Sequence, residues 1–185
     1  MADDNNIDYL KLMAALKYYQ QLGFQYVNLP WAVSDHFTDL TKPSNMKNFY
    51  LNDLALVGSG EQSFLSMLAN HQLPQGRYVG ITPCFRDEPQ VDELHSKYFM
   101  KVELIDTLNI NFDSLENIIM SAMKFFTPYG IECEIENTGI GSFDIIDSVN
   151  RIELGSYGIR QIEGMQWIFG TGCAEPRLTN IIKKL

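Results

Sequence analysis

The sequence predicts a single α+β domain over residues 1–185, built around a largely antiparallel sheet. Apolar residues recur with a helical period near the N-terminus, and several later segments alternate with the two-residue period of strands. Two of the strongest strand segments are joined by a short polar loop. The length is within the range of one domain, and no repeat or low-complexity linker divides the chain.

The first fifty residues predict one helix and one short strand. A helix is expected over 7–22, with Gly23 able to end it. The segment 24–30, FQYVNLP, predicts a short strand closed by its proline. Residues 31–50 are mixed in character and contain the turn residues 42–45, which predicts a connection with little regular structure.

The middle of the chain predicts strands that alternate with helices. Residues 51–73 predict a strand, a glycine turn and a helix that begins at about Glu61. The segments 76–86 and 94–108 predict two strands that form a hairpin. Asp113 and Glu116 have the spacing of a capping box, which predicts an amphipathic helix that ends near residue 128.

The last third predicts further strands and a final helix. Strands are expected at 131–137, 149–161 and 164–170. The segment 170–185 predicts a glycine turn into a short helix, with Pro176 near its first turn.

Composition excludes several classes of function. The net charge is −9 and the isoelectric point is about 4.7, which disfavours DNA binding and other extended nucleic-acid binding, because phosphate contacts require a basic surface. Three widely spaced cysteines without CxxC pairing argue against a disulfide framework or a structural zinc site. An acidic N-terminus and the absence of a membrane-length apolar run predict a cytoplasmic protein without a membrane partner.

The hairpin at 76–108 has two chemically different faces. Its core face carries apolar residues, among them Val79, Ile81, Val102 and Leu104. The other face carries Arg86, Glu88, His95, Phe99, Lys101 and Glu103. One interpretation is a half-solvated sheet with ion pairs Arg86–Glu88 and Lys101–Glu103. The other is a ligand face, with a flat group on Phe99 and anionic groups near Arg86 and His95, as ATP would provide.

The hairpin resembles motif 2 of the class II aminoacyl-tRNA synthetases, through Phe-Arg-x-Glu at 85–88 and His-x-x-x-Phe at 95–99. Residues 22–30 resemble motif 1, which builds the dimer interface in that family, and 170–177 resemble motif 3. Ser-Gly-Glu at 59–61 resembles the Thr-x-Glu loop of the seryl, threonyl, prolyl and histidyl subgroup. The resemblance implies a six- or seven-stranded antiparallel sheet flanked by helices.

The resemblance also implies an ATP site. Arg86 would hold the α-phosphate and act in catalysis, while Glu88 would meet the adenine amino group. Phe99 would stack under the base, and His95 would lie toward the γ-phosphate. Arg177, the second catalytic candidate, would cover the other face of adenine and touch the γ-phosphate.

The remaining assignments concern the metal and the second substrate. Glu153 resembles the carboxylate that binds Mg²⁺ between the phosphates. Ser59 and Glu61 would take the α-amino group, and Glu103 would reach the reacting centre or the amine. Structural alternatives stay open at three positions: a first-turn charge at Glu61, an ion pair with Arg151 at Glu153, and exposed helix surface at Arg177.

These implications predict ATP- and Mg²⁺-dependent adenylation of an amino acid or related small carboxylic acid. The enzyme would be a stand-alone catalytic domain without an anticodon-binding domain, and a homodimer through the region around Pro30. Because the charge is acidic and the chain ends eight residues after Arg177, the acceptor is not expected to be a whole tRNA. The alternatives are a non-catalytic regulatory paralogue that binds ATP or an amino acid, and a minimal tRNA-charging enzyme with a separate RNA-binding partner. Met165, Gln166 and Trp167 fit either a specificity pocket or the core.

Overall fold

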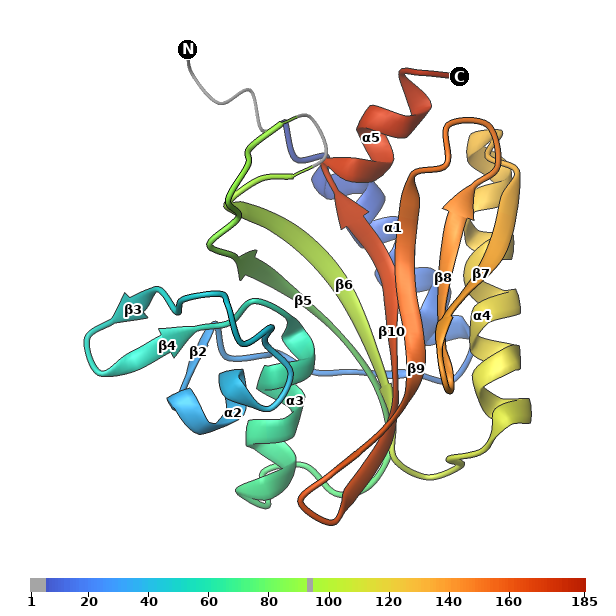
Figure 1. Cartoon of the computed structure of the whole chain (residues 1–185). Coiled ribbons are helices and arrows are strands. Elements are labelled where there is room, and N and C mark those ends of the chain that lie inside the picture. Colours follow the sequence, from blue (N-terminus) through green and yellow to red (C-terminus); the bar gives the residue numbers. More distant parts are fainter. Residues whose placement is uncertain (1–5, 93–94) are drawn as a thin grey trace.

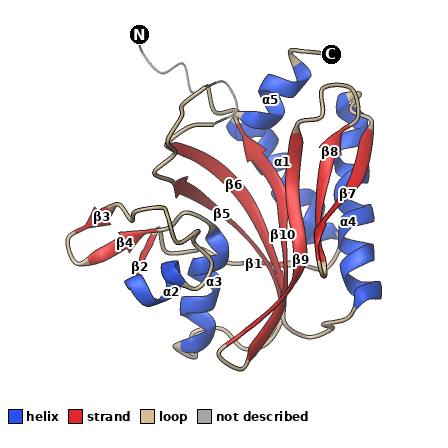
Figure 2. Ribbon diagram, viewed as in Figure 1, coloured by secondary structure: helices blue, strands red, loops and turns tan. Residues whose placement is uncertain are grey.

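The computed structural model describes residues 6–92 and 95–185, and a seven-stranded sheet forms its centre (Figures 1 and 2). In spatial order the strands are β1 (Gln25–Tyr26), β5 (Arg77–Phe85), β6 (Tyr98–Asp106), β10 (Met165–Glu175), β9 (Glu153–Ile162), β8 (Ser142–Asp147) and β7 (Cys133–Gly139). Every neighbouring pair is antiparallel except β1 and β5, which are parallel. The predicted α+β class with a largely antiparallel sheet is confirmed, and of the six or seven strands that the resemblance implied the sheet has seven.

Helices cover both faces of this sheet. The helices α1 (Tyr9–Gln21) and α4 (Phe112–Phe126) pack on one face, while α3 (Gly60–Ala69) packs on β5 and β6 from the other (Figure 1). The larger core therefore joins α1 and α4 to the sheet, and a smaller core lies beneath α3.

Strand alternation divides the side chains of the hairpin between these two cores, as predicted. Val79 belongs to the larger core and its neighbour Tyr78 to the smaller one. Lys101 and Glu103 point to the α3 side, but they are only 9% and 3% exposed. The half-solvated interpretation is therefore wrong for this part of the hairpin, because α3 covers it.

The segment 31–50 contains more regular structure than its sequence predicts. It forms β2 (Ala32–Val33), α2 (Asp35–Asp39) and β3 (Tyr50–Leu51), and β4 (Leu54–Leu56) lies between the two strands in a small second sheet. These pieces are too short to produce a period in the sequence. They are held by tertiary contacts, such as the bond that Gln62 Nε2 donates to the Thr38 carbonyl, 3.2 Å away.

Two helix boundaries follow local signals in the sequence. The residue after the C-cap of α1 is Gly23, whose φ of +88° favours glycine, as expected for a helix end. The predicted capping box at Asp113 is wrong, because Asn111 caps α4 by accepting a bond from the Ser114 amide at 2.9 Å. The helix ends at Phe126 as predicted, and a 3₁₀ turn, η1 (Thr127–Tyr129), follows.

The C-terminal glycines lie within a strand and not in the predicted turn. Gly170 and Gly172 belong to β10, which bulges between Thr171 and Cys173 before α5 (Arg177–Ile182) begins. A Cβ on Gly172 would lie 2.6 Å from the ring of Tyr19, so the residue permits close packing of α1 on the sheet. Strand β8, at 142–147, is a further element that the sequence did not predict. No helix in the described ranges has the length and apolar character needed to cross a bilayer.

Candidate functional site

A cavity of about 240 Å³ lies on the α3 side of the sheet. Its walls are the loop 41–48, the start of α3 and the facing strands β5, β6, β9 and β10. Five of the nine residues predicted for the site line it: Ser59, Glu61, Arg86, Glu103 and Glu153. Residues far apart in the sequence are thus brought to one cavity.

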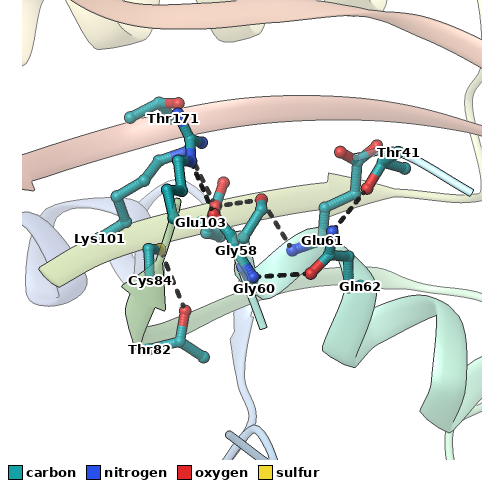
Figure 3. Close-up of polar contacts among 12 residues, drawn as sticks. Thr41, Gly58, Gly60, Glu61, Gln62, Thr82, Cys84, Lys101, Glu103 and Thr171 are labelled. Carbon is teal, nitrogen blue, oxygen red and sulfur yellow. Dashed lines mark hydrogen bonds and ion pairs between the residues drawn. The ribbon is translucent and has the colours of Figure 1, made fainter. Parts of the chain in front are cut away.

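The start of α3 is fixed to the sheet through Glu103. One carboxylate oxygen of Glu103 accepts bonds from the Ser59 hydroxyl at 2.5 Å and the Gly60 amide at 3.1 Å, and it lies 2.9 Å from Lys101 Nζ (Figure 3). The carboxylate therefore lies at the positive end of the helix dipole as well as beside a cation. Ser59 in turn caps the helix by accepting a bond from the Glu61 amide.

Gly60 is needed for this close approach. A Cβ at this position would lie 2.9 Å from the Thr82 hydroxyl and 3.0 Å from Glu103 Cγ. Any side chain would therefore push α3 away from β6 and separate the Ser59 hydroxyl from Glu103.

Gln62 connects the start of α3 to the rim of the cavity (Figure 3). Its carbonyl oxygen accepts a bond from the Gly58 amide at 2.8 Å. Its amide nitrogen donates to the Thr38 carbonyl and, at 3.1 Å, to the Thr41 hydroxyl. The side chain is 3% exposed, so it is a structural link between the two loops.

Glu61 forms a buried ion pair at the inner end of the cavity. One oxygen accepts a bond from Arg160, and the other accepts a bond from the Trp167 indole nitrogen at 2.6 Å. Burial raises the pKa of Glu61 above its ordinary value, and the Arg160 charge opposes that shift. Glu61 is therefore more than a first-turn charge, and Trp167, which is 1% exposed, belongs to the smaller core.

Arg86 lies between the cavity and Phe99. Its Nε donates to the Gly58 carbonyl at 3.1 Å, and its guanidinium carbon lies 5.0 Å from the centroid of the Phe99 ring. Phe99 does not line the cavity but supports the arginine that does.

Glu153 and Arg177 meet at the opposite end of β9. The Arg177 guanidinium donates to the Glu153 carboxylate at 2.9 Å, whereas Arg151 pairs with Glu134 and Glu136. The alternative pairing of Glu153 with Arg151 is therefore wrong, and Arg177 is tied to a residue of the cavity wall.

Asp144 lies close to Glu153. Burial raises the pKa of Asp144, and the Glu153 charge adds to that increase, while the Ser156 hydroxyl donates to Asp144 at 2.6 Å. Among residues 6–92 and 95–185 no group of three or more metal-ligating side chains is present. Mg²⁺ in nucleotide sites is usually held by one or two carboxylates together with phosphates, so Glu153, which lines the cavity, fits its needs, and Asp144 lies near it outside the cavity lining.

Three solved structures resemble the chain along most of its length. Seryl-tRNA synthetase from Pyrococcus horikoshii, complexed with ATP, is 21% identical over 94% of this chain and 49% of its own, with a TM-score of 0.73. Cytoplasmic serine-tRNA ligase from Naegleria fowleri, in complex with AMP, is 16% identical over 91% and 46% of the two chains, with a TM-score of 0.69. Pyrrolysyl-tRNA synthetase from Desulfitobacterium hafniense is 16% identical over 99% and 72%, with a TM-score of 0.73.

The chain has the catalytic-core fold of a class II aminoacyl-tRNA synthetase. It spans about half the length of the two seryl enzymes. No protein-family model and no curated protein sequence matches it.

Two residues assigned from the synthetase motif lie outside the cavity lining. His95 is exposed, and its ring nitrogen lies 2.9 Å from an oxygen of Asp92. Glu88 is half-buried beyond the end of β5. Their roles toward the γ-phosphate and the adenine amino group stay predictions.

The sequence did not assign several residues that line the cavity of this synthetase fold: Lys101, Ser156, Arg160 and Thr171. Lys101 could have been found, because it lies two residues before Glu103 on the same strand face. Arg160 could not, because its partner Glu61 is 99 residues away and no local pattern connects them.

The three cysteines are expected to react slowly in the native protein. Burial raises the pKa of the Cys84 thiol to about 11, although Lys101 opposes the shift, and the pKa of Cys133 is also raised to about 11. The pKa of Cys173 is raised well above its ordinary value. Because the thiolate is the reactive form, roughly one Cys84 in a thousand is reactive at pH 8, and the rate should rise with pH up to about 11.

Ellman's reagent provides the measurement. At pH 8 the folded protein should show no rapidly reacting thiol, and the denatured protein should show three. A thiol that reacts within the mixing time in the native protein would contradict the raised pKa values of these thiols.

Proposed function

We propose that the protein catalyses ATP-dependent adenylation of an amino acid or related small carboxylic acid. A carboxylate oxygen of the acid attacks the α-phosphorus of ATP, and the bond from that phosphorus to the pyrophosphate oxygen breaks. The products are an acyl adenylate and pyrophosphate. This step needs alignment and charge neutralisation more than a protein base.

The observation that carries the proposal is the state of Arg86. In the described part of the chain, Arg160 and Arg177 each pair with a carboxylate, whereas Arg86 contacts only a carbonyl and an aromatic ring. A cavity arginine without an anionic partner is suited to bind a phosphate group, and its planar fork matches two phosphate oxygens. The ATP and AMP complexes of the two seryl enzymes support this use of the fold.

Other residues of the cavity would bind the metal ion and the acid. Glu153, with Asp144 beside it, would hold Mg²⁺, which would neutralise phosphate charge. Ser59 and Glu103 would face an amino group of the acid, because a hydroxyl oxygen and a carboxylate can accept its N–H bonds. Arg177 lies beyond Glu153. The acceptor of the acyl group is proposed to be other than a whole tRNA, because the chain carries a net charge of −9.

ATP–pyrophosphate exchange tests the proposal. The full chain with Mg²⁺ should exchange label when supplied with a suitable acid from a panel of the twenty amino acids and small mono- and dicarboxylic acids. Calorimetry with ATP should be run in parallel. Binding of ATP without exchange for any acid would indicate a regulatory paralogue, and neither binding nor exchange would overturn the nucleotide site itself.

We further propose a homodimer through the region around Pro30. Tyr26 and Trp31, which flank that proline, are 45% and 58% exposed in the isolated chain, so they are available to a second copy. Sedimentation should give about twice the 21.1 kDa chain mass, and Trp31→Lys should lower it to that of one chain. Ile140→Lys, on the distant β7–β8 turn, is the matched control, and a wild-type monomer would contradict the proposal.

A further inference from the structure

Arg160 is held in the cavity wall by two contacts. Its guanidinium carbon lies 4.0 Å from the centroid of the Phe169 ring, and one of its nitrogens bonds to Glu61. Phe169 can occupy this place because its partner across the strands is Gly158, where a Cβ would lie 2.8 Å from the ring. Three elements, α3, β9 and β10, therefore fix the orientation of one arginine.

The position of Arg160 along β9 separates it from the proposed phosphate site. Glu153, which contacts Arg177, lies at the start of the strand, and Ser156 follows on the cavity wall. Arg160 lies four residues further, or roughly 13 Å along the strand at about 3.3 Å per residue. An acid whose reacting carboxylate lies toward the Glu153 end of the cavity would therefore extend its distal end toward Arg160.

Most donors of Arg160 remain available. Within the described residues, its guanidinium makes one hydrogen bond, although it carries five N–H groups. Its side chain is 35% exposed and lines the cavity. Both oxygens of Glu61 are already bonded, one to Arg160 and the other to Trp167. They leave the other N–H groups of Arg160 available.

The surroundings disfavour an apolar substrate. The side chains in contact with Arg160 are the Glu61 carboxylate, which it binds, and the Phe169 ring, which its guanidinium already covers. An aliphatic chain placed here would remove water from the free N–H groups of Arg160 without replacing those hydrogen bonds, which is costly.

We propose that Arg160 is a specificity-determining residue and that the substrate is a small acid with a second, distal carboxylate. The planar guanidinium would bind that carboxylate through its free N–H groups, since paired N–H donors match two carboxylate oxygens. The inference rests on the proposed adenylation function and adds the class of the substrate to it.

Succinate and its monoamide, succinamate, test the inference because they differ only in the distal group. Neither has an α-amino group, so any role of Ser59 or Glu61 toward an amine does not enter the comparison. ATP–pyrophosphate exchange should show kcat/KM at least about tenfold higher for succinate, because a charge-assisted pair is roughly twice as strong as a neutral hydrogen bond. L-Aspartate against L-asparagine should show the same preference.

The double variant Glu61→Gln/Arg160→Gln removes the charge pair without leaving one buried charge unpaired. It should reduce the preference for succinate to near parity while exchange with succinamate persists.

Arg160→Lys keeps the charge without the planar fork and should retain a partial preference. Arg151→Gln is the matched control, because Arg151 precedes β9 and pairs with exposed carboxylates outside the cavity, and it should keep the full preference. Thermal unfolding confirms that each variant is folded.

Calorimetry with succinate and α,β-methylene-ATP separates the failure of this inference from that of the function. Exchange that is as efficient with succinamate or neutral amino acids as with succinate would overturn the inference and leave adenylation intact. Succinate binding that the double variant loses, without exchange for any acid, would support the distal carboxylate site and overturn adenylation. The absence of both exchange and binding would overturn both.

Discussion

Arg86→Ala is expected to lower the rate of ATP–pyrophosphate exchange by roughly 10²–10³, the loss typical for one preorganised group that stabilises transition-state charge. The reason is that Arg86 lines the cavity and has no carboxylate partner among the described residues. Steady-state exchange measured over a range of ATP concentrations gives kcat and KM for the variant. The larger effect should fall on kcat, because charge accumulates around the α-phosphate during the reaction.

Two variants control this result. Arg151→Ala removes an arginine whose partners, Glu134 and Glu136, are exposed, and it should exchange like the wild type. Arg86→Lys keeps one positive charge without the planar fork and should fall between the wild type and the alanine variant. An Arg86→Ala protein that exchanges within a factor of three of the wild type would remove Arg86 from the proposed mechanism.

Trp167→Ala is expected to lower the free energy of unfolding by about 3–5 kcal/mol, the usual cost of truncating a buried tryptophan. Trp167 is among the largest fully buried side chains, and its indole N–H is one of two donors that hold the buried Glu61 carboxylate. The variant therefore leaves a cavity in the smaller core and removes a hydrogen bond from a buried charge. Equilibrium unfolding in guanidinium chloride, followed by circular dichroism, measures the change.

Trp167→Phe separates the two contributions, because phenylalanine keeps most of the ring volume but cannot donate to Glu61. Its cost should be about 1–3 kcal/mol, the range for leaving a buried polar group unsatisfied. Ile140→Ala is the control for an apolar truncation, since Ile140 is fully exposed, and it should change the free energy by less than about 0.5 kcal/mol. A Trp167→Ala protein as stable as this control would show that the indole is not part of the core.

Long periodic elements could be predicted from the sequence, whereas short ones held by tertiary contacts could not. The hairpin of β5 and β6 was predicted with the correct faces, because alternation over nine residues determines which side chains share a face. The elements β2 and α2 were missed, since two to five residues carry no measurable period. The glycines of β10 were taken as a turn, although their use is close packing against Tyr19 and Tyr157.

The candidate site shows the same division. Arg86 and Glu103 could be found because the hairpin fixes their common face and the synthetase motif provides their spacing. Glu61 was found through its place beside Ser59, but its pairing with Arg160 depends on how β9 lies across from α3. No local pattern encodes a contact between residues 99 positions apart.

The link through Gln62 has an evolutionary consequence. One amide joins the Gly58 loop on one side to the Thr38 carbonyl and the Thr41 hydroxyl on the other, so the two sides of the cavity rim are linked through one side chain. A descendant that adapts to a bulkier ligand by changing wall residues alone would still carry this link, which joins the two sides of the rim. We therefore expect position 62 to be among those that change in such a lineage, with a shorter or non-bonding residue that releases this link.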